Sequence, residues 1–270
     1  FTHFNPQSQK EEDFLANFVA RGGMLAYYLR QLRLLEPTRP ATHHLIIAPR
    51  GYGKTALLRR IAIAVRTEPD LNSRLIALSF REEQYNVISL DVFWRNCLQS
   101  LLEVREDEKA TEDEIMRLDA AWDKHAPRQA LKREDQDGEP VKQEFNLHCE
   151  QLGRRPLLLI DNLDALLAGL PENHQWSLRN DLQRSGGPVL IAAASRYPES
   201  THDQKSAFYD FFRIQTLDKL DDNEVMHCLR IRAQNRGEAG KKVLDLIEKS
   251  PGRVGALNTL AGGNPRTLGV

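Results

Sequence analysis

The sequence is poor in cysteine and in aromatic residues, and it has no excess of charge of either sign. The three cysteines lie far apart and form no CxxC or Cys/His cluster, so neither a disulfide framework nor a structural zinc site is expected. The 37 basic residues are balanced by 38 acidic residues, which leaves a formal net charge of −1. The chain therefore lacks the bulk positive charge of many nucleic-acid-binding domains, and only a local basic patch stays open.

Long apolar runs and targeting segments are also missing. No run approaches the length of a transmembrane helix, and the first residues do not form a signal peptide. We therefore expect no membrane partner and a reducing, cytoplasmic location. A chain of 270 residues is long enough for one large α/β domain and a small second domain.

What the sequence does contain is a strand, a glycine-containing turn and a helix in immediate succession. Residues 44–55 read HLIIAPRGYGKT, and the helical pattern ALLRRIA follows them. This is the phosphate-binding P-loop pattern, with Ala48 at the place of its first glycine. Gly51 and Gly53 let the backbone turn so that successive N–H groups point at phosphate oxygens. The helix that follows adds the positive end of its dipole.

The side chains of this loop have distinct expected roles. Lys54 can reach the β- and γ-phosphates of a nucleotide, and the Thr55 hydroxyl can ligate Mg²⁺. The other nucleotide contacts that we expect from the loop are Pro49, Arg50, Gly51, Tyr52, Gly53 and Ala56. The remaining parts of a nucleotide site should then lie further along the chain.

A second apolar strand ends in an acid. Residues 157–164 read LLLIDNLD and suit a strand that is buried on both faces. Asp161 comes at the C-terminal end of this strand, where open α/β sheets bind their ligands. The segment resembles a Walker B motif, in which Asp161 would hold Mg²⁺ directly or through water. The alternative is a core strand followed by an Asx turn.

A third apolar strand ends in a hydroxyl and a guanidinium. It reads VLIAAASR at 189–196, and both Ser195 and Arg196 are able to face a γ-phosphate or to position water. Many strands end in such residues, so a solvated Arg196 is the alternative.

Around these motifs, the apolar pattern predicts an α/β fold, namely a P-loop NTPase with a parallel sheet flanked by helices and a small C-terminal helical lid. We expect an ATPase core at 1–220 and the lid at 221–270, with the chain ending inside the lid as a fragment of something longer. The charged stretch at about 105–153 is expected to be a solvated helical insertion. Further helices are expected at 11–34, 90–104, 174–184, 223–235 and 239–249 and from Pro265, and further strands at 75–80 and 212–215.

Together these motifs resemble those of the AAA+/STAND class of P-loop ATPases, which includes NB-ARC-type switches and origin-recognition-type initiators. The segment FVAR at 18–21 is similar to an N-terminal motif of the class, and the P-loop has the form PRGxGKT that is common there. The pair Ser195–Arg196 matches the sensor-1 position. The segment GNPR at 263–266 fits both the Gly-x-Pro lid motif of NB-ARC proteins and the GxxR sensor-2 motif of initiators.

The resemblance implies an ATPase with ATP or ADP and Mg²⁺ as cofactors. It places Val19 and Arg21 against the adenine and makes Arg196 a γ-phosphate sensor. It also lets Pro265 pack on the adenine and gives Arg266 the sensor-2 role. Self-association through the ATPase module, and effector or sensor domains beyond residue 270, are further implications of the resemblance.

One departure from the class bears on catalysis. AAA+ members place a glutamate, and many STAND members an acid, directly after the Walker B aspartate, but here Asn162 stands there. An amide can orient the attacking water and cannot take its proton. Asp164 is a candidate substitute, with an N-cap of the next helix as its alternative role, and Glu82 and Glu83 are remoter candidates. We therefore predict tight binding of Mg-ATP with slow turnover.

Three functions stay open on this basis. The main interpretation is a STAND-like switch or oligomerisation engine, in which nucleotide exchange frees the lid and domains outside this chain act. The first alternative is an initiator- or transposition-type AAA+ ATPase that acts on DNA, which Arg266 favours and the balanced charge disfavours. The second alternative, motivated by Asn162, is a nucleotide-binding scaffold that never hydrolyses.

Overall fold

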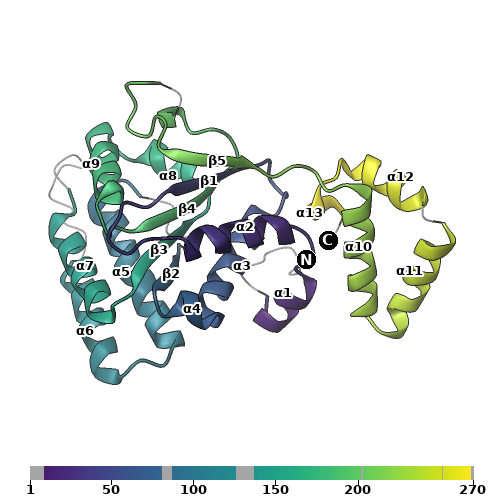
Figure 1. Cartoon of the computed structure of the whole chain (residues 1–270), viewed down its shortest axis with the longest axis horizontal. Helices are drawn as coiled ribbons and strands as arrows, with labels where there is room; N and C mark the ends of the chain where they lie inside the picture. The colour runs from purple at the N-terminus through teal and green to yellow at the C-terminus, as the bar shows by residue number, and fades with distance from the viewer. Residues whose placement is uncertain (1–8, 81–86, 126–136, 202, 251, 269–270) are drawn as a thin grey trace.

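Within the described residues, five parallel strands form one sheet, as the apolar runs predict. The computed structural model describes residues 9–80, 87–125, 137–201, 203–250 and 252–268. The strands are β1 (His43–Ile47), β2 (Leu75–Ser79), β3 (Arg155–Ile160), β4 (Val189–Ala194) and β5 (Phe212–Thr216). They lie in the order β2-β3-β4-β1-β5 (Figure 1). Strands β1 and β4 are buried along their whole length, because helices cover both faces of the sheet.

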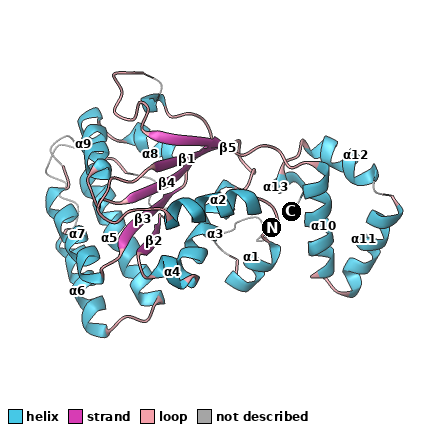
Figure 2. Ribbon diagram, in the orientation of Figure 1, coloured by secondary structure: helices cyan, strands magenta, loops and turns pink. Residues whose placement is uncertain are grey.

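The helices that cover the sheet form two layers. One face packs against α2 (Gly22–Arg33), α3 (Lys54–Thr67) and α4 (Pro69–Asn72). The other face packs against α5 (Leu90–Asp107), α6 (Glu112–Lys124), α7 (Glu139–Leu152), α8 (Leu163–Gly169) and α9 (Glu172–Gln183). Figure 2 shows the sheet between the two layers. Successive side chains of β1 point to opposite faces of the sheet. Ile46 packs against the first layer of helices, and Leu45 and Ile47 pack against the second.

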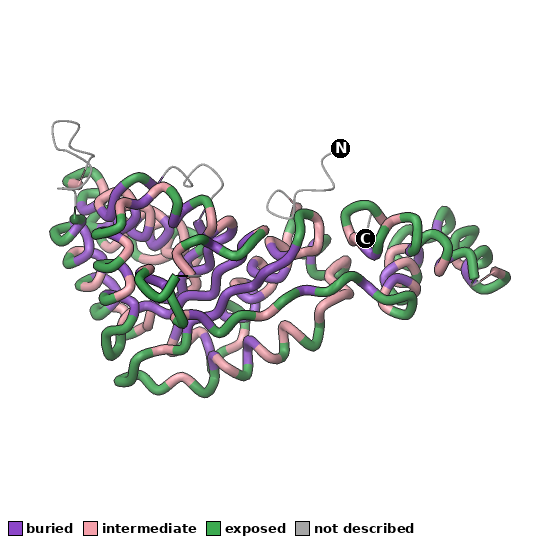
Figure 3. The backbone as a smooth tube through the Cα atoms, turned by 90° about the horizontal axis from the view of Figure 1, so that it is seen from above, coloured by how far each residue is buried: buried purple, intermediate pink, exposed green. Residues whose placement is uncertain are grey.

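The C-terminal helices lie to one side of these layers (Figure 3). They are α10 (Asp222–Gln234), α11 (Glu238–Lys249), α12 (Gly252–Ala261) and α13 (Pro265–Leu268). A small apolar cluster of their own includes Val225, Ile247 and Val254. Helix α12 was not expected from the sequence, because its two glycines and its irregular apolar pattern give no helical signal.

The prediction of one helix over 11–34 is wrong in its middle. The structure has α1 (Glu11–Asn17) and α2, and the residues between them form a turn. Arg21 adopts a left-handed conformation with φ of 70°, and Gly22 and Gly23 follow it. This backbone conformation cannot be part of an α-helix, so the segment FVAR forms a turn between α1 and α2.

The stretch at 105–153 is more than a solvated insertion. Leu118 of α6 and Val141 and Phe145 of α7 are buried in the core that lies against α5 and the sheet. The apolar residues of α7 recur at helical spacing, which gives that helix one face to bury, and the buried Lys142 on it pairs with Asp181 at 2.8 Å. The prediction from mixed charge alone was therefore wrong for this part.

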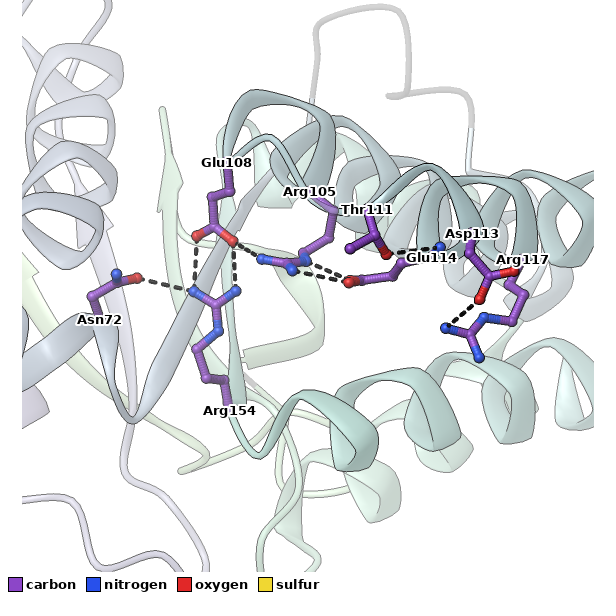
Figure 4. Close-up of polar contacts among 8 residues, drawn as sticks. All are labelled: Asn72, Arg105, Glu108, Thr111, Asp113, Glu114, Arg117 and Arg154. Carbon is purple, nitrogen blue, oxygen red and sulfur yellow. Dashed lines mark hydrogen bonds and ion pairs between the residues drawn. The ribbon is translucent and has the colours of Figure 1, made fainter.

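A network of ion pairs fixes the α5–α6 turn against the rest of the fold (Figure 4). The Nε of Arg105 lies 2.6 Å from Glu114, and the same guanidinium pairs with Glu108. Glu108 also accepts from Arg154 at 2.6 Å, and Arg154 donates to Asn72 Oδ1 at 2.9 Å. These charged groups are largely buried, so each needs its partners to offset desolvation.

His43 makes the stability of this fold depend on pH. Its Nδ1 accepts from the Leu190 amide at 3.1 Å, and its ring stacks on Phe211 with 4.7 Å between centroids. Burial lowers the pKa of His43 from 6.5 to about 4, and burial does the same to His44. As the pH falls, the unfolded chain therefore takes up a proton on His43 before the folded chain does. The stabilising contribution of the neutral ring is fully present above pH 6.5 and is lost as the pH falls toward 4.

We expect the free energy of unfolding to fall between pH 7 and pH 4.5 by on the order of 2 kcal/mol for each of these histidines. Urea denaturation at several pH values measures this. His43→Gln keeps a donor and an acceptor but no titrating ring, so its stability should depend less steeply on pH. An equal pH dependence in the two proteins would contradict the assignment.

Candidate functional site

The loop between β1 and α3 has the backbone that phosphate binding requires. Gly51 and Gly53 adopt left-handed conformations with φ of 87° and 89°, which only glycine reaches without strain. Gly53 is the N-cap of α3 and has no side chain to cap it. The first N–H groups of α3 are therefore left for an external acceptor, and the predicted strand–turn–helix order is confirmed.

Lys54 folds back over this loop. Its Nζ donates to the carbonyl oxygens of Ala48 at 2.6 Å and Pro49 at 3.1 Å. Burial lowers the pKa of Lys54, and within the described part of the chain its ammonium has no ion pair. A cation whose hydrogen bonds go to neutral carbonyls is a strong partner for an anion that enters the loop.

Thr55 and Asp161 meet beside the loop. The Thr55 hydroxyl donates to Asp161 Oδ2, and the other carboxylate oxygen accepts from the Asn162 amide at 2.9 Å. Asp161 lies directly after β3 and is only 8% exposed. One hydroxyl and one carboxylate, next to the place for phosphates, are the oxygen ligands that Mg²⁺ takes in proteins, so the residues fit that ion.

The residues after Asp161 have separate positions. Asn162 is the N-cap of α8 and has a φ of 50°, a conformation that asparagine tolerates better than most residues. Asp164 lies in the first turn of α8, so the alternative that it is the N-cap is wrong. It is largely buried and its Oδ2 is 3.9 Å from the Arg196 guanidinium. The remoter candidates Glu82 and Glu83 lie outside the described residues.

Of the two predicted sensor-1 residues, Ser195 and Arg196, one lines the cavity and the other does not. Ser195 lines the same cavity as the loop, whereas the Arg196 side chain is 80% exposed and does not line it. Arg196 reaches the site only through Asp164 in this arrangement.

The residues at the start of α13 contact the loop directly. The backbone N–H of Arg266 donates to Gly51 O at 3.3 Å, and Asn264 Nδ2 donates to Arg50 O at 3.2 Å. The Oδ1 of Asn264 accepts from the Arg266 amide at 2.9 Å. A Cβ added at Gly51 would lie 2.6 Å from that oxygen. Glycine is therefore needed at this position for the close approach of the C-terminal residues as well as for the left-handed backbone.

One cavity of about 390 Å³ joins these parts. All of the predicted nucleotide contacts except Pro49 line it, together with Asp161, Asn162 and Ser195. The cationic residues in its wall are Arg21, Arg50, Lys54, Arg232 and Arg266, whereas Asp161 is the acid there. Although the net charge of the chain is −1, the wall of this cavity is positively charged, which favours a polyanionic ligand.

Sequence reasoning missed a part of this cavity. The missed lining residues are Gln9, Phe14, Asn17, Leu220, Cys228 and Arg232, whereas Phe18 and Ala20 belong to the FVAR segment that the resemblance had named. Phe14 lies four residues before Phe18 of the FVAR segment, and this helical spacing is a usable signal for Phe14. Cys228 and Arg232 are one turn apart on α10 and belong to no motif.

Asn264 gives a test of the contact between the loop and the C-terminal helices. Asn264→Ala removes the hydrogen bond to Arg50 O and the cap of α13, and we expect ATP to bind about 5- to 20-fold more weakly. Amide exchange in the loop should become faster. Asn223→Ala, at an exposed position of α10, is the matched control and should change neither quantity. An unchanged affinity and exchange rate in Asn264→Ala would show that the contact has no effect.

Comparison with known proteins places the chain by its fold. No protein-family model matches it. A 50-residue stretch, 18% of this chain and 14% of the relative, is 40% identical to an ATP-dependent protease ATP-binding subunit-like protein of Rhodococcus erythropolis.

The solved structures that match most of the chain include the following two. Cdc6p from Pyrobaculum aerophilum has a TM-score of 0.54 at 13% identity over 87% of this chain and 53% of that one. The Aeropyrum pernix ORC1 protein, solved in complex with DNA, has a TM-score of 0.50 at 12% identity over 82% of this chain and 53% of that one. The chain thus spans about half the length of these proteins. The parallel sheet between two helical layers, the P-loop and the C-terminal helices show that the chain has an AAA+ P-loop NTPase fold, which it shares with these two structures.

Proposed function

We propose that this chain binds ATP or ADP with Mg²⁺ and hydrolyses ATP slowly. The observation that carries the proposal is the single cavity that unites the glycine loop, Lys54, and the Thr55–Asp161 pair. The loop supplies backbone N–H groups for the phosphates, and the surrounding arginines supply positive charge. Both are needed for a triphosphate and neither is needed for a structural turn.

The side chains divide the work as follows. Lys54 exchanges the carbonyls of Ala48 and Pro49 for the β- and γ-phosphate oxygens. Thr55 and Asp161 provide the ligands for Mg²⁺, which when bound neutralises charge on those phosphates.

Asn162 and Ser195 line the cavity and orient the attacking water by hydrogen bonds. Neither takes a proton from that water at neutral pH, so we expect turnover well below the ~10 s⁻¹ of a median enzyme.

Among the function classes, we favour an initiator-type AAA+ ATPase that acts on DNA over the STAND-like switch. The fold similarity to Cdc6p and to an ORC1 protein solved with DNA supports it. The hydrogen bond from the Arg266 backbone N–H to Gly51 O supports it too, because it holds the sensor-2 candidate next to the glycine loop. With a net charge of −1, any DNA contact must be local.

The proposal also includes an ATPase core over 1–220 with a lid over 221–270, and self-association of the module in the cytoplasm. Effector domains beyond residue 270 complete it, as the half-length match to the two similar structures supports. Within the described residues, no helix is both long enough and apolar enough to cross a membrane.

The test is made on the purified chain. Bound nucleotide is extracted and identified, phosphate release from Mg-ATP is followed, and binding to duplex DNA is titrated at several salt concentrations with ATP and with ADP. We expect nucleotide binding, slow multiple turnover, and DNA binding that weakens as salt rises. Binding of ATP without turnover would favour the scaffold alternative, and DNA binding that is absent in every nucleotide state would favour the switch. A chain that binds no nucleotide at millimolar concentration would overturn the proposal.

A further inference from the structure

The cavity has an end that lies away from the glycine loop. Helix α10 starts near the loop, since the Leu220 amide donates to Gly263 O at 3.0 Å, close to the residues that contact Gly51. It then runs toward α1, where Asn235 Nδ2 donates to Ala16 O at 3.2 Å. Arg232 lies ten residues after the start of α10, which is about 15 Å along the helix axis.

Arg232 is a half-buried cation in the wall at this end. Within the described ranges its guanidinium makes no hydrogen bond and no ion pair, in contrast to Arg21, which donates to the Asp218 carbonyl. Burial lowers the pKa of Arg232 and of Arg21. An arginine that is desolvated without an acceptor gains most from a ligand that brings one.

Asn17 supplies the opposite kind of group. It follows Ala16, so it lies beside the turn of α10 that carries Arg232, and it lines the same cavity. Its Nδ2 donates to the backbone carbonyl of Asp13 in α1 at 2.7 Å, and this hydrogen bond sets the orientation of the side-chain amide. The amide oxygen, Oδ1, is thereby left as an acceptor.

We propose that Arg232 and Asn17 read the base of the bound nucleotide and select adenine. The Arg232 guanidinium donates to a ring nitrogen of the base, and Asn17 Oδ1 accepts from the exocyclic amine. This inference rests on the proposed nucleotide binding and deepens it, because none of the sequence motifs contains either residue.

The chemistry of the purines explains the selection. Adenine carries an amine, which is a donor, next to ring nitrogens that are acceptors, so it matches an acceptor and a donor side by side. Guanine carries a carbonyl oxygen at that position, and this oxygen would face Asn17 Oδ1, another acceptor. The amide cannot simply turn over, because Nδ2 would lose the Asp13 carbonyl. A site of this kind discriminates through the polar group that is left unpaired.

The experiment compares ligands with and without a base. Dissociation constants for ATP, GTP and inorganic tripolyphosphate are measured by calorimetry on the parent chain, Arg232→Met, Arg232→Lys and Asn17→Ala. Arg232→Met keeps a long apolar stem, and Arg232→Lys keeps the charge should the methionine variant not fold. Arg230→Met, at an exposed position of the same helix, is the matched control.

We expect the parent to prefer ATP to GTP by about tenfold or more, and Arg232→Met to weaken ATP binding about 10- to 100-fold. Tripolyphosphate affinity should stay within about twofold in every variant, and Arg230→Met should match the parent. Asn17→Ala should lower the preference for ATP over GTP.

Equal weakening of ATP and tripolyphosphate in Arg232→Met would place Arg232 at the phosphates and overturn the inference. Unchanged ATP binding in both Arg232 variants would overturn it as well. These results leave the proposed function standing, whereas a parent that binds neither ATP nor tripolyphosphate overturns both.

Discussion

Replacing Lys54 by alanine is expected to weaken the binding of Mg-ATP at least 100-fold and to abolish phosphate release. The lysine contributes a desolvated positive charge whose present partners are two neutral carbonyls, of Ala48 and Pro49. Hydrogen bonds from a charged donor to a buried anion are among the strongest in proteins, and this one also fixes the γ-phosphate.

The stability of the ligand-free protein separates a binding defect from a folding defect. Lys54 is buried without an ion pair among the described residues, so its removal should leave the melting temperature of the ligand-free chain unchanged or slightly higher. Mg-ATP should raise the melting temperature of the parent, because a ligand that binds the folded state stabilises it. It should not raise that of Lys54→Ala, which no longer binds the ligand. Lys241→Ala, on an exposed position of α11, should behave as the parent. An undiminished ATP-induced shift in Lys54→Ala would show that the phosphates bind elsewhere.

The parts of the site that sequence predicts well are those in which the chemistry is local. A phosphate-binding turn needs left-handed glycines at fixed spacing and a helix directly after them, and Gly51, Gly53 and α3 provide this within a few residues. The parallel sheet was predictable for the same reason, because strands buried on both faces are continuous apolar runs. The position of Asp161 follows from both, since parallel strands end at one edge of the sheet.

The parts that sequence does not predict depend on contacts between distant segments. Arg232 and Asn17 are brought to one cavity by the docking of α10 on α1, and neither has a local pattern. The left-handed conformation of Arg21, which divides α1 from α2, is a backbone choice for a residue type that seldom adopts it. Mixed charge likewise hid the apolar face of α7, because only the position of that helix over the sheet shows what its face is for.

The proposed class of function depends on the C-terminal residues more than on the loop. Gly263 fits its place because a Cβ there would lie 2.6 Å from the Lys219 side chain, so its role in the fold alone accounts for it. Arg266 is different, since its backbone is hydrogen-bonded to the glycine loop and its side chain lines the cavity. The GNPR motif fits two classes equally, and the fold similarity supports the origin-recognition type only as our proposal.

Replacing Asn162 by aspartate is expected to raise the rate of ATP hydrolysis about 10- to 100-fold. Asn162 lines the cavity directly after Asp161, at the position from which a carboxylate can take a proton from the attacking water. Its left-handed backbone decides which acid to introduce. Aspartate shares the tolerance of asparagine for a φ of 50°, whereas glutamate would be strained there by roughly 1 kcal/mol.

The controls separate proton transfer from other effects of the change. Asn162→Gly keeps the backbone conformation and removes the polar group, so its turnover should fall below that of the parent while ATP still binds. Rates measured against pH carry the decisive signature, because turnover in Asn162→Asp should decline at acid pH as the new carboxylate becomes protonated.

Asp164 competes with Asn162 for the catalytic role, and the pair of variants distinguishes them. Asp164 is largely buried next to Arg196 in the first turn of α8, and unlike Asn162 it does not line the cavity. If Asp164 is the base already, Asp164→Asn will abolish the slow hydrolysis and Asn162→Asp will add nothing to it. If Asn162 marks a missing base, Asp164→Asn will leave the low rate within a few-fold and Asn162→Asp will raise it, which is the result that we expect from the side-chain positions.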